Sequence, residues 1–143
     1  MTDCKYLNTG YAHKCTVGLS DIDLFMHMSY ANYLRLLFQA SDGFFLSLTG
    51  KEFLKKNRIK ANKTSVEFKY QTELGDIIII YVLLGAMNCD SWELIYKFEL
   101  EDNNKLIALG RQAFSIDSNH TDGKDALFRR IKEISKGGNA YDL

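Results

Sequence analysis

The chain has 143 residues, of which 46% are hydrophobic and 25% charged, and its 18 basic side chains balance its 18 acidic ones. A chain of this length can bury a sizeable core, so we expect one domain over residues 1–143. The balanced charge argues against general binding to nucleic acid or to an acidic membrane surface.

The N-terminal segment and the cysteines indicate where the protein works. The first 15 residues carry charges and lack the apolar core of a signal peptide. Cys4, Cys15 and Cys89 are odd in number and show no C-x-x-C spacing, which predicts neither a disulfide framework nor a metal site. A reducing compartment is the simplest interpretation, and we expect a cytoplasmic protein.

The first predicted elements are a short strand and a long helix. Residues 13–19 alternate between polar and apolar side chains and predict the strand. From about residue 30 to residue 48 apolar residues cover most of a helix, and one narrow polar stripe contains Asn32, Arg35, Gln39 and Asp42. A helix this apolar needs other structure around most of its surface. Because Arg35 and Asp42 interrupt it, we predict no membrane span.

Strands dominate the second half of the chain. Residues 51–60 are polar and ambiguous, and a short helix with a turn is one interpretation. Strands are then predicted over residues 64–70, 77–87, 91–101 and 106–116, followed by an amphipathic helix over about 124–136. One apolar helix followed by long antiparallel strands predicts an α+β fold in which a curved sheet folds about that helix. We place the core at about residues 12–117.

The segment 20–35 carries the residues with the clearest chemical potential. Asp21, Asp23 and His27 precede the start of the long helix. A carboxylate ahead of a helix N-terminus combines a base or nucleophile with backbone N–H groups that stabilise an anion, and acyl transfer needs both. The alternatives are a loop or helix-capping role for Asp23 and a packed structural role for His27. A turn-forming or strand-ending role fits Asp21 best.

The same segment resembles the signature of the hotdog-fold thioesterases of the 4-hydroxybenzoyl-CoA thioesterase-like group. That signature reads D-x-D-x-x-x-H, then valine or methionine, then N-N-x-x-Y. Ser29 and Tyr30 stand at its two asparagine positions, and the matching residues are Asp21, Asp23, His27, Met28 and Tyr33. A second local resemblance, to the family's second strand and its turn, runs from Val66-Glu67-Phe68 to Leu74-Gly75-Asp76.

The resemblance implies a hotdog fold, in which a curved antiparallel sheet wraps around the central helix, and an acyl-CoA thioesterase. It implies that Asp23 attacks the thioester or activates water, and that the Tyr30 N–H at the helix start polarises the carbonyl. His27 would orient Asp23 or touch the substrate, and Ser29 and Tyr33 would bind the substrate. The helix and residues 77–87 would line an acyl tunnel. No metal or redox cofactor is implied, because coenzyme A enters as part of the substrate.

The expected partners follow from the same resemblance. Acyl-carrier protein is the alternative acyl carrier to coenzyme A, and relatives of this kind form homodimers or homotetramers with sites between subunits. Lys55, Lys56 and Arg58 belong to a basic cluster after the helix that suits the phosphates of coenzyme A or the acidic helix of a carrier protein. A solvated charged face is the other interpretation of this cluster.

Other functions remain open from the sequence. A non-catalytic acyl-binding or scaffold protein would keep the fold without the chemistry, and Ser29 and Tyr30 in place of the asparagines favour it. A hydratase acting on enoyl thioesters would share the fold and the carrier. In a second branch of hotdog thioesterases the working carboxylate lies on the central helix, where Asp42 is the sole acid here. The stripe that contains Asp42 otherwise reads as a solvated or subunit-facing helix edge.

Overall fold

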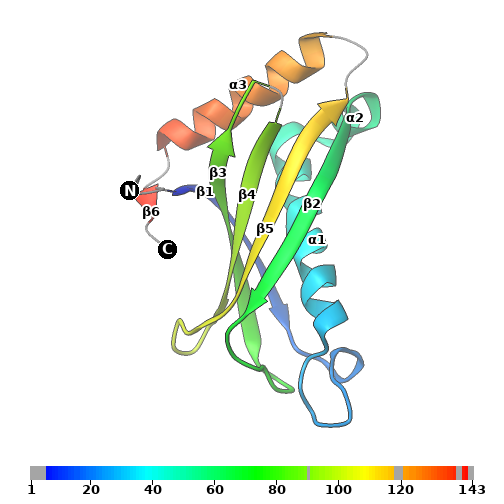
Figure 1. Ribbon diagram of the computed structural model, residues 1–143, viewed down its shortest axis with the longest axis vertical. Coiled ribbons are helices and arrows are strands. Elements are labelled where there is room, and N and C mark those ends of the chain that lie inside the picture. The colour runs from blue at the N-terminus through cyan, green and yellow to red at the C-terminus, as the bar shows by residue number, and fades with distance from the viewer. Residues whose placement is uncertain (1–5, 90, 118–120, 138–139, 142–143) are drawn as a thin grey trace.

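The computed structural model describes residues 6–89, 91–117, 121–137 and 140–141 (Figure 1). Its strands form one antiparallel sheet in the order β2-β5-β4-β3-β1-β6. The strands are β1 (Tyr6–Thr16), β2 (Arg58–Phe68), β3 (Ile77–Met87), β4 (Ser91–Leu100), β5 (Leu106–Asp117) and β6 (Ala140–Tyr141). The sheet is twisted and curved, and the long helix α1 (Tyr30–Thr49) runs along one side of it (Figure 1).

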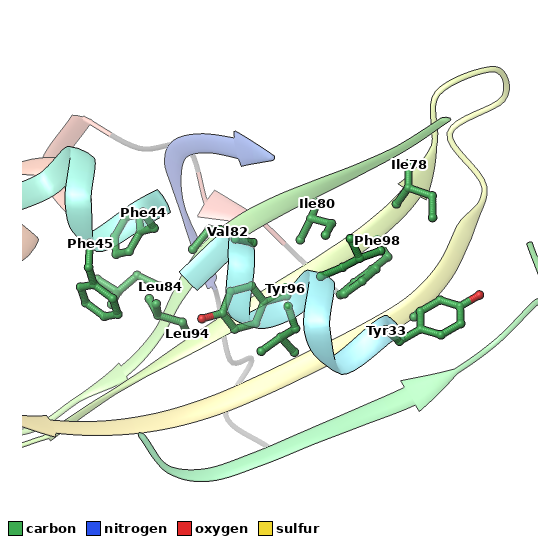
Figure 2. Packing of buried hydrophobic residues seen from close by; sticks show 14 of the residues in the cluster. Tyr33, Phe44, Phe45, Ile78, Ile80, Val82, Leu84, Leu94, Tyr96 and Phe98 are labelled. Carbon is green, nitrogen blue, oxygen red and sulfur yellow. The ribbon is translucent and has the colours of Figure 1, made fainter. Parts of the chain in front are cut away.

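The core lies between α1 and the central strands. Side chains at every second position of β3 and β4 face the helix, and register pairs such as Val82 with Tyr96 set them side by side. Figure 2 shows this layer against α1, with the labelled residues Ile78, Ile80, Val82, Leu84, Leu94, Tyr96 and Phe98 all buried. The helix approaches β5 so closely that a Cβ atom on Gly110 would collide with Leu37. Burial of each large apolar side chain contributes about 1.5–3 kcal/mol, so this layer fixes the position of α1 on the sheet.

The helix α3 (Thr121–Gly137) crosses one end of the sheet (Figure 1). Leu127 and Ile131 are fully buried, and the ring of Phe128 packs edge-on against Trp92 with ring centroids 5.7 Å apart. This contact extends the core to the C-terminal part of the chain. In the described ranges, no helix is long and apolar enough to cross a membrane.

The predicted order of one strand, one apolar helix, four strands and a terminal helix is confirmed. The bounds differ most at the two strands with polar sequences. β1 begins at Tyr6 and ends at Thr16, and residues 19–21 form the short 3-10 helix η1 (Leu19–Asp21) instead of continuing the strand. β2 begins at Arg58, six residues before the predicted start, directly after the helix α2 (Lys51–Lys56).

The early start of β2 has a physical reason. β2 lies at the edge of the sheet and pairs on one side with β5, and its first half bears mostly exposed polar side chains. A bulge between Ala61 and Lys63 also shifts the alternation by one residue. The hydrophobic pattern that marks a half-buried strand is therefore missing there.

Candidate active site

The segment between η1 and α1 folds back on itself in a tight turn. The backbone N–H of Asp23 donates to the carbonyl of His27 at 2.8 Å, and the N–H of Met26 donates to the carbonyl of Asp23 at 3.1 Å. Met26 has a positive φ of 65°, the left-handed conformation that closes such turns. The returning strand continues through Met28, whose N–H donates to the carbonyl of Thr72 at 3.2 Å. Asp23 and His27 therefore sit opposite each other beside the start of α1.

Only one oxygen of the Asp23 carboxylate takes part in the hydrogen bonds that the structure describes. Its Oδ1 accepts hydrogen bonds from the N–H groups of Phe25 at 2.8 Å and of His27 at 3.3 Å. Among the described residues, no group donates to Oδ2. The side chain is exposed, and its apolar neighbours in the sequence are exposed as well: Leu24 by 99%, Phe25 by 78% and Met26 by 50%. Within one chain, these three side chains do not desolvate Asp23.

His27 contacts Asp23 through its backbone. The imidazole is half-buried, and it makes no hydrogen bond within the described part of the chain. The hydrogen bond from His27 to the Asp23 side chain is thus made by the backbone N–H of His27 and not by its imidazole ring.

Asp21 anchors the segment to the helix. Its Oδ2 accepts from the N–H of Gly18 at 2.8 Å, and its Oδ1 pairs with the Arg35 guanidinium at 2.6 Å. The carbonyl of Asp21 accepts from the Asn32 side chain at 2.7 Å and from the Ser29 N–H at 3.2 Å. These contacts give Asp21 the structural role expected for it. They also place Asn32 and Arg35, predicted on a solvated or subunit-facing edge, in the support of the loop.

The N-terminus of α1 opens beside Asp23. Ser29 is the N-cap residue, but its side chain does not cap the helix: its Oγ instead accepts from Asn32 Nδ2 at 3.1 Å. Within the described ranges, no acceptor bonds to the Tyr30 N–H, and no acidic residue lies in the first helical turn. The positive end of a 20-residue helix is therefore not neutralised from within the helix.

Tyr33 forms the floor of the site. It is 3% exposed, and its hydroxyl hydrogen-bonds to Thr72 Oγ1 at 3.0 Å. Its ring packs edge-on against Phe68, at 4.7 Å between centroids. Burial raises the pKa of the Tyr33 hydroxyl, which therefore stays protonated at neutral pH.

These residues enclose one pocket of about 380 Å³, lined by Asp23, His27, Met28, Ser29, Tyr30, Tyr33, Phe68, Lys69, Tyr70 and Gln71. The volume falls in the range of small-molecule sites. It joins an exposed carboxylate, a free helix N-terminus and aromatic walls. Such a site can hold an acyl group, polarise its carbonyl oxygen and present a carboxylate to it.

The structure brings five of the predicted site residues together and leaves three apart. Asp23, His27, Ser29, Tyr30 and Tyr33 share the pocket. Lys55 and Lys56 lie on α2, which follows the opposite end of α1, and α1 is about 30 Å long. Arg58 begins β2 and lines a different cavity beside α1. The cation that lines the pocket is Lys69, which pairs with Glu67 at 2.8 Å.

The pattern also missed residues that complete the pocket. Phe68, Lys69, Tyr70 and Gln71 belong to the end of β2 and the segment after it, and only Phe68 stood in a motif. The predicted acyl tunnel differs as well. The β3 side chains that face α1 are packed into the core, and the pocket lies between α1 and the end of β2. Within the described residues, no cluster of three potential ligands could hold a metal ion.

Comparisons with known proteins identify the family and the fold. The family model of the thioesterase-like superfamily matches residues 17–135. No curated protein matches the sequence closely enough to be counted as a relative.

Solved structures show the same fold at low sequence identity. The hypothetical protein SAV2348 from Staphylococcus aureus, solved in complex with CoA, has a TM-score of 0.80 and 17% identity, over 100% of this chain and 92% of that one. The BH1999 gentisyl-coenzyme A thioesterase has a TM-score of 0.71 and 19% identity, over 83% of this chain and 99% of that one. The probable thioesterase YbaW from Escherichia coli has a TM-score of 0.72 and 16% identity, over 87% of this chain and 98% of that one.

Proposed function

We propose that this chain hydrolyses the thioester of an acyl-CoA. The chain belongs to the thioesterase-like superfamily and has the hotdog fold. One observation carries the proposal: the Asp23 carboxylate and the unused N–H at the start of α1 line the same pocket. The carboxylate can attack the thioester or activate water, and the N–H can hold the carbonyl oxygen that becomes charged.

In the proposed reaction the thioester carbonyl oxygen accepts a hydrogen bond from the Tyr30 N–H at the positive end of α1. Asp23 then acts through its free Oδ2. As a general base it takes a proton from water, and the hydroxide adds to the carbonyl carbon. As a nucleophile it adds directly, and water later cleaves the resulting anhydride. In both routes the C–S bond breaks, the thiolate of coenzyme A leaves, and the carboxylic acid is released.

The pocket walls support an acyl-CoA as the substrate class. Tyr30, Tyr33, Phe68 and Tyr70 offer apolar faces to the acyl group beside the thioester. Lys69 at the pocket is the candidate contact for the phosphates of coenzyme A or for an acidic carrier protein. Lys55, Lys56 and Arg58, which the sequence suggested for this role, lie at the other end of α1. The structural neighbours support coenzyme A over a carrier protein, because one is described as a complex with CoA and another as a CoA thioesterase.

We further propose that the working form is a homodimer or homotetramer with the site between subunits. The exposed side chains of Leu24 and Phe25 lie next to Asp23. A second subunit that covers them would remove water from around the carboxylate, which a single chain does not achieve.

The test is free-thiol release from short, long and aromatic acyl-CoAs by the wild type and by Asp23→Asn. We expect release by the wild type and a loss of at least about a hundredfold in Asp23→Asn, the lower range for removing a general base. Asp102→Asn, an exposed aspartate in the turn after β4, is the matched control and should keep full activity. Unchanged release by Asp23→Asn would exclude its assigned role.

A non-catalytic acyl-binding protein is the second candidate. It is favoured by the exposure of Asp23 and by the absence of the asparagine pair at Ser29 and Tyr30. Against it, the Asn32 side chain spans Asp21 and Ser29 and so braces the loop from within the helix. Binding of acyl-CoA without thiol release from any member of the panel would favour this candidate.

A further inference from the structure

A second cavity, which we call the distal pocket, lies between the middle of α1 and the first half of β2. It has a volume of about 440 Å³. Phe38, Phe45 and Leu46 of α1, Ile59 of β2 and Phe114 of β5 supply most of its apolar wall. It shares no lining residue with the pocket that contains Asp23.

The distal pocket has a polar floor. Gln112 and Ser41 line it, although they are only 1% and 4% exposed. Tyr96, fully buried beside α1 (Figure 2), donates from its hydroxyl to Gln112 Oε1 at 2.6 Å. Gln112 Nε2 donates to Thr64 Oγ1 at 3.1 Å, and Ser41 lies close to the Tyr96 hydroxyl. Side chains of β2 and β4 therefore hold the amide of Gln112 on β5 in a fixed orientation.

Burying these polar side chains costs desolvation free energy, which an apolar core would avoid and which their hydrogen bonds must offset. A side-chain amide has two N–H groups and two acceptor lone pairs. The bonds to Tyr96 and Thr64 use one of each, so one donor and one acceptor remain on a residue that lines the cavity. The floor is thus prepared for a group that both donates and accepts.

The two pockets lie along the same helix and strand. Tyr30 and Phe68 belong to the pocket with Asp23, whereas Ser41 and Ile59 belong to the distal pocket. From Tyr30 to Ser41 the helix rises about 16 Å. An extended acyl chain whose carbonyl lies at the Tyr30 N–H and which follows α1 can reach the distal pocket.

We propose that the distal pocket receives the far end of the acyl group and selects acyl chains that end in a hydroxyl group. This inference rests on the proposed function, and it names the class of acyl group that the enzyme takes.

The charges at the pocket favour a neutral hydroxyl over an ion. Asp42 and Arg58 both line the cavity, so its wall carries charges of opposite sign and does not favour a ligand of either sign. A hydroxyl can donate to Asp42 or Gln112 and accept from the remaining amide N–H.

The test compares lauroyl-CoA with ω-hydroxylauroyl-CoA, which differ by one terminal oxygen. We expect the wild type to favour the hydroxylated substrate by about tenfold in kcat/KM, the effect of one or two net hydrogen bonds. Ser41→Ala and Gln112→Met should reduce this ratio to about one. Ser47→Ala is the matched control, because Ser47 lies on the same helix and bonds only to the carbonyl of Phe44 at 3.0 Å. ω-Carboxylauroyl-CoA should be the poorest of the three substrates.

Binding to Asp23→Asn separates the two proposals. Calorimetry with this variant measures the affinity for each intact thioester. A tenfold preference in affinity without thiol release by the wild type would support the distal pocket and overturn the proposed hydrolysis. Thiol release with a ratio near one in the wild type, or a preference that Ser41→Ala and Gln112→Met leave unchanged, would overturn the distal pocket alone. Ser41→Ala keeps the comparison valid if Gln112→Met does not fold.

Discussion

Asp21 and Asp23 stand two residues apart, and their carboxylates have different surroundings. That of Asp21 is 14% exposed and pairs with Arg35 and the Gly18 N–H, whereas that of Asp23 is exposed and bonds only within its own turn. Sequence patterning distinguished them through the family signature. Spacing alone gives no such distinction, because both residues precede the same helix.

We expect Asp21→Ala to lower the free energy of unfolding by about 1–2 kcal/mol, since it removes a charge-assisted pair and leaves the Gly18 N–H without its acceptor. Asp23→Ala should change stability by about 0.5 kcal/mol or less. Urea denaturation of the two variants measures the contrast. Equal losses of stability would contradict the structural role given to Asp21.

Asp42 predicts a pH dependence with a definite sign. Partial burial raises its pKa above the ordinary value of 3.8, so the folded state binds this proton more tightly than the unfolded state. The charged form therefore weakens the fold as pH rises from 3.8 through the raised pKa, and the full penalty holds at neutral pH. We expect Asp42→Asn to be more stable than the wild type at pH 7 and equally stable below 3.8. Denaturation at both pH values tests this, and an advantage that persists in acid would refute the explanation.

At the scale of elements, the Asn32 side chain joins the start of α1 to the preceding loop, beside the pair of Arg35 with Asp21. Asn32 donates to the Asp21 carbonyl and to Ser29 Oγ, and its own oxygen accepts from Arg35 Nε at 3.2 Å. Asn32 thus positions the loop that carries Asp23 without lining the pocket.

We expect Asn32→Ala to reduce kcat about tenfold or more, because a small displacement of Asp23 from the helix N-terminus weakens the reacting geometry. KM should change less, since the aromatic walls remain. Asn32→Asp keeps the acceptor for Arg35 but loses both donated bonds, and should be equally slow. Steady-state kinetics with thermal melting tests this: a fall in activity that only follows lost stability would contradict a positioning role.

Most elements could be predicted because their hydrophobic pattern matches their burial. β3 has its predicted bounds because Ile77–Met87 is apolar and central, and α1 starts at Tyr30 as predicted. The first half of β2 could not be predicted from the sequence, because an edge strand with polar exposed side chains has no apolar period.

The same limit applies to the candidate site. Tyr33 and Thr72 meet across 39 residues of sequence, and such a contact leaves no local signal.

For the whole molecule, apolar residues gather on the outer face of α1. Tyr30, Leu34, Phe38 and Leu46 follow a helical spacing of four or eight residues and are 40–71% exposed. Beside them β2 forms a sheet edge, and an edge strand has unpaired backbone groups. Contiguous exposed apolar surface of this kind marks an interaction site. The expected homodimer or homotetramer would bury it.

We therefore predict that the wild type sediments as two or more copies and that Leu34→Glu shifts it to a single copy. A buried leucine contributes about 1.5–3 kcal/mol per subunit, and a two-fold interface counts it twice, so a charge there should weaken association at least a hundredfold. Leu74→Glu is the matched control, because Leu34 and Leu74 are both 40% exposed and Leu74 lies outside α1. Sedimentation velocity over a range of concentrations measures the number of copies.

If the site lies between subunits, Leu34→Glu should also lose thiol release at concentrations where it is a single copy. A wild type that sediments as one copy at all concentrations would refute the assembly, and a single-copy variant with full activity would place the complete site within one chain.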